Sequence, residues 1–258
     1  EVSKYFDRTV NEWIQKTQFH GSIGQSVLCP TKNGQMIALL GMGNKNSRKR
    51  TRFQLAAAAK SLPPGSYEIL NPEAVENFEI ETLGWLMNSY IFDRYKNKKD
   101  AQAYLVEPKT INSKRILQIA EAEAFARDLI NTPTSDMGPE NLALAAKSLA
   151  NKFNAYYSEI VGEELIEKNF PLIHSVGRAS SQEPRLLTIK RGNKGPKVTL
   201  VGKGVCFDTG GLNIKPGRSM GLMKKDMGGA ANVLALASMI LSANMDVQLT
   251  VLIPAVEN

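Results

Sequence analysis

Short apolar runs and a small-residue block mark the first elements along the chain. Apolar runs at residues 36–40 and 103–106 predict buried strands. The alanine-rich block at residues 53–62 predicts a helix, because Pro63, Pro64 and Gly65 follow it and stop helical structure.

Longer stretches with apolar residues at helical spacing predict three further helices. They cover residues 73–94, 113–130 and 140–151. The polar and proline-containing residues 131–139 separate the last two, and Pro139 stands where a helix tolerates proline, in its first turn.

The second half contains a strand, a helix and a strand in succession. Residues 197–201 and 247–253 are β-branched and apolar, while residues 227–243 are apolar on nearly every helical face. This order predicts a βαβ unit with parallel strands and a buried helix. Because sites in such sheets form beyond the carboxyl ends of strands, we expect chemistry after Val201 and at residues 254–258.

These elements predict an α/β fold with two domains. We expect a smaller N-terminal α/β domain at residues 1–112 and a connecting helix and linker at residues 113–138. Residues 139–258 would then begin a C-terminal domain built on a mixed, largely parallel sheet between helices.

Composition excludes several classes of protein. The 258 residues are 43% hydrophobic, which is incompatible with intrinsic disorder. No apolar run approaches the roughly 18 residues of a membrane span, and no signal peptide is visible. Two cysteines and two histidines argue against a disulfide scaffold, an HExxH zinc site and a Ser-His-Asp triad. The first residue is not Met, so we expect a piece of a longer protein.

The net charge of +7 raises the question of a nucleic-acid partner. Lysines are spread along the chain, and the dense basic run at residues 45–52 is interpreted as a solvated loop. A nucleic-acid partner is therefore not expected from composition.

Residues 201–231 carry the candidate chemistry. The Gly202-Lys203-Gly204 sequence lacks the pattern of a Walker phosphate loop. One Asp208-Thr209-Gly210 sequence in an α/β pattern does not match the paired aspartates of an aspartic protease. A phosphate site like that of sugar kinases stays open, and it would bind ATP without a transition metal.

A carboxylate metal site is the other open interpretation. Asp208 and Asp226 are oxygen ligands suited to Zn²⁺, Mn²⁺ or Mg²⁺, and Lys203 follows the end of a predicted strand. Taken singly, an Asp before a helix is usually an N-cap and an Asp-x-Gly-Gly sequence is usually a turn. The combination of two lysines and two aspartates at one end of a sheet favours a site.

The motifs in this segment resemble those of one family. Lys203 lies in a GKGV sequence, Asp208 in FDTGG, Lys215 in an Ile-Lys pair and Asp226 in DMGGAA. Asp208 follows Lys203 by five residues, and it precedes Lys215 by seven residues and Asp226 by eighteen. They are similar to the signature of the leucine (cytosol) aminopeptidases, the two-metal M17 peptidases. Residues 131–133 with 139–143 are similar to the family's interdomain connector, and residues 253–258 resemble the strand end that follows. Residues 84–96 resemble the N-terminal domain of the bacterial branch.

The resemblance implies specific roles. Lys203, Asp208 and Asp226 match metal ligands, with Asp208 bridging two divalent ions, Mn²⁺ or Zn²⁺, and Lys215 matches the catalytic lysine that polarises the substrate carbonyl. Lys203 would ligate a metal as a neutral amine, whereas Lys215 would act as a cation. Residues 139–258 would be the first portion of the catalytic metallopeptidase domain, which acts on peptide substrates.

The resemblance also implies features outside the chain. The family's NTDAEGR motif, which supplies further carboxylate ligands and an Arg that holds bicarbonate, would follow residues 254–258, but the sequence ends at Asn258. We therefore expect this chain alone to be inactive. The resemblance further implies a homohexamer in the cytoplasm that is not bound to membranes. A DNA-binding regulatory role, known for some relatives, is the alternative function.

Overall fold

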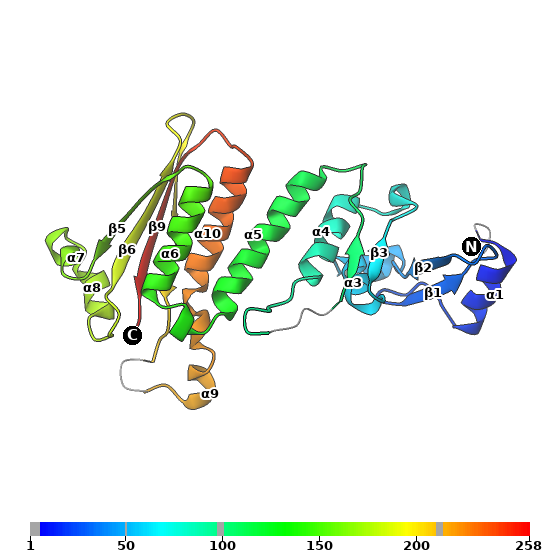
Figure 1. The fold of residues 1–258 in the computed structure, drawn as a ribbon, viewed down its shortest axis with the longest axis horizontal. Helices are drawn as coiled ribbons and strands as arrows, with labels where there is room; N and C mark the ends of the chain where they lie inside the picture. Colours follow the sequence, from blue (N-terminus) through cyan, green and yellow to red (C-terminus); the bar gives the residue numbers. More distant parts are fainter. Residues whose placement is uncertain (1–5, 50, 97–100, 210–213) are drawn as a thin grey trace. The chain divides into compact units, whose positions relative to one another are not determined.

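The structure is a computed structural model that describes residues 6–49, 51–96, 101–209 and 214–258 (Figure 1). The chain divides into two compact units, Glu1–Ala120 and Glu121–Asn258. The two-domain α/β prediction is confirmed, whereas the limits proposed at residues 112 and 138 stay a prediction.

The first unit contains two small sheets and several short helices. Its first helix, α1 (Arg8–Lys16), begins at Asp7, whose carboxylate accepts a 3.0 Å hydrogen bond from the backbone N–H of Val10. The antiparallel strands β1 (Ser26–Pro30) and β2 (Met36–Leu40) form one sheet. The parallel strands β3 (Gly65–Tyr67) and β4 (Ala103–Leu105) form the other.

Helices close the core of the first unit. The 3-10 helix η2 (Gln54–Ala57) continues into α3 (Ala58–Ser61), so the alanine-rich block is helical as predicted. With α4 (Phe78–Asn88) they bury a cluster of apolar side chains around Trp85: Leu55, Ala58, Ala59, Leu62, Phe78 and Ala103.

The prediction of one long helix over residues 73–94 is wrong. The structure has a short 3-10 helix, η3 (Pro72–Ala74), then a break, and α4 ends at Asn88. The break comes at Asn77, whose φ of 55° is left-handed and incompatible with a continuous right-handed helix. The helical spacing of apolar residues persists across this break, which is why the pattern overestimated the length.

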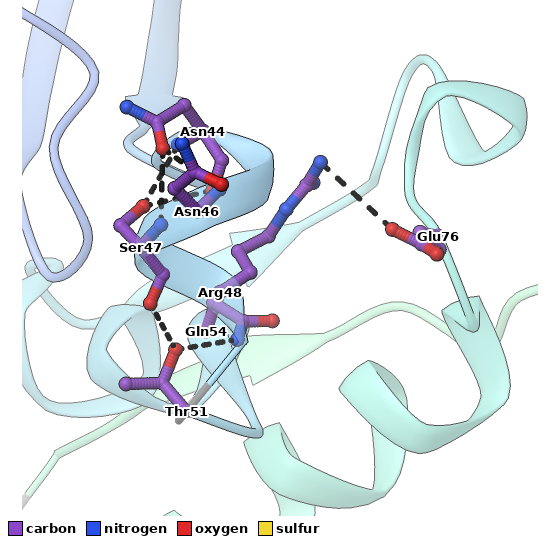
Figure 2. A network of polar contacts seen from close by, with 7 residues as sticks. All are labelled: Asn44, Asn46, Ser47, Arg48, Thr51, Gln54 and Glu76. Carbon is purple, nitrogen blue, oxygen red and sulfur yellow. Dashed lines mark hydrogen bonds and ion pairs between the residues drawn. The ribbon is translucent and has the colours of Figure 1, made fainter.

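The first part of the basic run, Lys45–Arg48, is helical and not a loop. Residues Lys45–Arg48 form the short helix α2, and the side-chain Oδ1 of Asn44 accepts hydrogen bonds from the backbone N–H groups of Asn46 and Ser47, each 3.0 Å long (Figure 2). Arg48 turns toward Glu76, with 3.8 Å between Nη2 and Oε2. The interpretation as a solvated loop is thus wrong for Arg48, while Lys45 and Lys49 are exposed.

The second unit is built on one mixed sheet. Its strands β5 (Tyr156–Val161), β6 (Arg185–Arg191), β9 (Gln248–Val256) and β7 (Lys197–Val201) lie side by side in that order. The short strand β8 (Gly204–Val205) also pairs with β9. The mixed sheet is confirmed, with its described parallel part limited to the pairings of β7 and β8 with β9.

Helices cover one face of this sheet and reach the other face only near its end. The long helix α5 (Ser113–Asn131) leads through the 3-10 turn η4 (Thr134–Asp136) into α6 (Pro139–Lys152). Helices α6 and α10 (Gly228–Ser242) pack on the face formed by alternate β9 side chains, Leu249, Val251, Ile253 and Ala255 (Figure 1). On the other face, Val256 packs against Gly177 at the end of α8 (Pro171–Gly177), which follows α7 (Glu164–Glu167).

The predicted βαβ unit is confirmed, because β7 and β9 are parallel and α10 lies between them in sequence. Two short helices precede α10, namely α9 (Gly217–Met220) and the 3-10 helix η5 (Met223–Met227). None of the helices in the described part of the chain has the length and apolar character of a membrane span.

Candidate metal centre

The segment after β7 runs beside the carboxyl end of β9. Strand β8 pairs in parallel with Ala255 and Val256, and the backbone N–H of Cys206 then donates a 2.7 Å hydrogen bond to the Val256 carbonyl. The two strand ends that the sequence singled out therefore meet at one edge, as expected for parallel strands.

Asp208 is held at this edge by hydrogen bonds of its two neighbours. The Phe207 carbonyl accepts from the backbone N–H of Asn258 at 2.9 Å. The Asn258 carbonyl accepts from both the N–H and the hydroxyl of Thr209, at 2.6 and 3.1 Å. Fixing the backbone on both sides of Asp208 limits where its half-buried carboxylate can point.

Glycines bring the start of α10 against the loop that carries Lys203. A β-carbon on Gly202 would lie 2.8 Å from the Cα of Ala230, and one on Gly229 would lie 2.9 Å from the backbone nitrogen of Lys203. Both are closer than real β-carbons approach, so only glycine fits. The Ala230 N–H uses this proximity to donate a 2.9 Å hydrogen bond to the Lys203 carbonyl.

This approach places Lys203 opposite Asp226. The Lys203 ammonium group forms an ion pair with Oδ2 of Asp226, whose side chain is 19% exposed. Asp226 lies in η5, and the N-cap position of α10 is Met227 instead. The carboxylate therefore faces the lysine rather than capping the helix, which is the ordinary role of an Asp before a helix.

Lys215 joins the segments of the two aspartates. Its Nζ lies 2.5 Å from Oδ2 of Asp208 and 3.5 Å from the sulfur of Met223, which is in the same 3-10 helix as Asp226. The structure thus forms two lysine–aspartate pairs from the four candidate residues, and Lys215 also contacts Met223 in the 3-10 helix that carries Asp226. Gly210 and Gly211 of the FDTGG motif lie outside the described residues.

Sequence reasoning missed two side chains that support this centre. The Thr134 hydroxyl donates a 2.9 Å hydrogen bond to the Cys206 carbonyl, and the Lys224 ammonium group donates one of 2.9 Å to the Asn131 carbonyl. The resemblance included residues 131–133 only as a connector. No periodicity or spacing signal in the sequence links them to residues 206 and 224.

The donor chemistry fits part of a divalent metal site. Two carboxylates and one amine are donors that Mn²⁺ and Zn²⁺ accept in proteins. Within the described residues, no group of three or more His, Cys, Asp or Glu side chains gathers to hold a metal ion. These residues therefore supply a partial coordination shell. Burial raises the pKa of the neighbouring Cys206 thiol to about 12.

Comparison with known proteins identifies the family to which the two units are similar. Residues 124–258 match the family model "Cytosol aminopeptidase family, catalytic domain", and residues 4–108 match "M17 aminopeptidase, N-terminal domain". A probable cytosol aminopeptidase from Aquifex aeolicus is 32% identical over the whole chain, which covers 56% of that relative. One from Rhodococcus jostii is 34% identical over 85% of the chain and 47% of the relative.

Solved structures give the same result. The crystal structure of cytosol aminopeptidase from Coxiella burnetii is 40% identical, with a TM-score of 0.91 over 99% of this chain and 55% of that one. The bottromycin maturation enzyme BotP, solved in complex with Mn, is 26% identical with a TM-score of 0.83, over 98% of this chain and 58% of that one.

The chain spans about half the length of the curated relatives it matches. The catalytic-domain model covers more than half of the chain, and both units match the family in the order that the fold shows. The chain therefore belongs to the cytosol aminopeptidase family.

Proposed function

We propose that this chain, joined to the remaining half of the family sequence, forms a metal-dependent aminopeptidase that releases N-terminal residues such as leucine from peptides. The observation that carries the proposal is the pairing of Lys203 with Asp226 and of Lys215 with Asp208 at one edge of the sheet. We therefore assign hydrolysis to that edge of the sheet.

Each of the four side chains has a proposed part. Lys203, Asp208 and Asp226 would hold Mn²⁺ or Zn²⁺, with Asp208 shared between two ions. Two such ions, when bound, supply a Lewis acid and an activated water. Lys215 would place its positive charge where negative charge develops on the substrate carbonyl oxygen, because a preorganised cation stabilises that charge. Bicarbonate would be held by an Arg of the family's NTDAEGR motif.

We propose that the 258-residue chain by itself is inactive and binds metal weakly. Two carboxylates and one amine leave a two-metal site short of ligands, since such ions usually take four or more each. From the family resemblance we further propose a homohexamer in the cytoplasm, a location that the names of the cytosol aminopeptidase relatives also support.

The test compares two proteins on leucine p-nitroanilide with Mn²⁺. One is the 258-residue chain, and the other is the chain joined to the rest of the family sequence. We expect release of p-nitroaniline by the longer protein only, and loss of release when a chelator removes the metal. Hydrolysis by neither protein would contradict the aminopeptidase proposal, and equal hydrolysis by both would contradict the incomplete site.

A further inference from the structure

Two separate segments carry the candidate metal ligands, and both are tied to one turn. Asp208 follows β8, whereas Asp226 lies in η5, and neither sequence proximity nor a shared element fixes their separation. We propose that the turn at residues 131–134 sets this separation, with Thr134 and Lys224 as positioning residues. The inference rests on the proposed function, because it assigns the turn a role in holding the metal ligands.

The first tie reaches the Asp208 segment. The Thr134 hydroxyl donates its 2.9 Å hydrogen bond to the carbonyl of Cys206, two residues before Asp208. Cys206 is 1% exposed, and its N–H is bonded to Val256 of the central strand. The Thr134 bond thus connects the turn to a backbone that the sheet already holds in place.

The second tie reaches the Asp226 segment. The half-buried Lys224 donates its 2.9 Å hydrogen bond to the carbonyl of Asn131. Lys224 lies two residues before Asp226, just as Cys206 lies two residues before Asp208. Asn131 is the last residue of α5, where backbone carbonyls lack helical partners and a cation is favourable. The hydrogen bond therefore gives a carbonyl at the end of α5 a cationic partner and fixes η5 to that helix.

The turn itself is rigid enough to act as a common reference. Thr132 is 2% exposed, and its hydroxyl donates a 2.6 Å hydrogen bond to the Asp128 carbonyl within α5. The backbone N–H of Met137 donates a 3.2 Å hydrogen bond to the Thr134 carbonyl across η4. The Met137 side chain is buried in the core. Helices α5 and α6 enter and leave the turn, so it cannot move without disturbing both.

Metal affinity is sensitive to such support. Groups that hydrogen-bond to metal ligands without contacting the metal orient those ligands, and their removal typically lowers metal affinity by about 10- to 100-fold. Here each tie acts through the backbone two residues before a ligand. Loss of either bond would therefore let one carboxylate drift relative to the other without removing any ligand.

The experiment uses the chain joined to the rest of the family sequence, and it measures Mn²⁺ binding by calorimetry. Thr134→Val and Lys224→Met each remove one tie, and we expect each to raise the Kd for Mn²⁺ by about 10-fold or more. Thr134→Ser and Lys224→Arg keep the hydroxyl and the cation, and we expect them to restore most of the affinity. Circular dichroism establishes that every variant is folded at the temperature of the titration.

Tyr157→Phe provides the matched control. It also removes a hydroxyl that donates to a backbone carbonyl, that of Ala143 at 3.3 Å, but neither residue lies in the turn or in the segments of the two aspartates. We expect it to keep the wild-type Kd.

If Thr134→Val and Lys224→Met bind Mn²⁺ as tightly as Tyr157→Phe, the positioning role is wrong while the proposed function stands. If Thr134→Val does not fold, Lys224→Met decides alone. A wild-type protein that neither binds Mn²⁺ nor hydrolyses the substrate contradicts the proposed function instead.

Discussion

Oδ2 of Asp208 and Nζ of Lys215 lie 2.5 Å apart, whereas the other candidate lysine, Lys203, pairs with Asp226. The two lysines thus stand in different surroundings: the Lys215 side chain is 33% exposed and also contacts Met223, while that of Lys203 is 58% exposed. Substitution of each lysine tests the different roles proposed for them.

The first prediction separates these roles by substitution in the chain joined to the rest of the family sequence. Lys203→Ala removes a proposed ligand, so we expect lower occupancy of one metal. Lys215→Ala removes the proposed electrophile, so we expect both metals to remain and turnover to fall by about 10²–10³-fold. Metal content per protomer and kcat, measured on the same samples, check this. Metal loss in both variants, or in neither, would contradict the division of roles.

The second prediction concerns the close approach of α10 to Lys203. Gly229→Ala would place a β-carbon 2.9 Å from the Lys203 backbone nitrogen, so we expect a loss of about 1–3 kcal/mol in the free energy of unfolding. The neighbouring Gly228 is the control, because its β-carbon would meet only the Ile130 side chain at 3.8 Å. Gly228→Ala should be neutral or stabilising by up to about 1 kcal/mol. Urea denaturation of both variants measures the difference, and equal stabilities would refute the packing argument.

The third prediction concerns the two faces of α10. Leu234 is 0% exposed and lies in the main core cluster, whereas Leu236, two residues on, is 44% exposed. We expect Leu234→Ala to cost about 2–5 kcal/mol of unfolding free energy through the cavity it leaves. Leu236→Ala should stay within about 0.5 kcal/mol of wild type. Thermal and urea unfolding check the pair, and a cost at Leu236 as large as that at Leu234 would mean that the exposed face is covered.

The sequence predicts the second unit better than the first. Residues 197–201, 227–243 and 247–253 form β7, α10 and β9 with small changes at the ends, because long apolar runs dominate local preference there. In the first unit, elements are short, and a single left-handed residue, Asn77, ends a pattern that looks continuous. Such a break depends on backbone geometry that apolar spacing does not encode.

The candidate site was predicted as a set of residues but not as an arrangement. The pairing of Lys203 with Asp226 depends on how closely α10 approaches the loop after β7, which Gly229 permits. The supporting bonds of Thr134 and Lys224 join residues 72 and 93 positions away in the sequence. Contacts over such separations are fixed by tertiary packing, and no local pattern reports them.

The fourth prediction concerns a buried acid in the first unit. Glu81 is 4% exposed, and its carboxylate accepts a 2.8 Å hydrogen bond from the backbone N–H of Leu55 at the start of η2. Burial disfavours the charged form and raises the pKa of Glu81 above its ordinary value of 4.5, although backbone hydrogen bonds and Arg48 oppose this.

A raised pKa means that the folded chain holds the Glu81 proton to higher pH than the unfolded chain does. Its stabilising contribution is therefore complete below pH 4.5 and is lost as the pH rises through the folded-state pKa. Glu81→Gln, which stays neutral, should lose less stability than wild type between pH 4 and pH 7. Melting temperatures of both proteins across this range measure the difference. If wild type instead gained stability relative to Glu81→Gln with rising pH, the backbone hydrogen bonds would outweigh burial, and the pKa would be lowered.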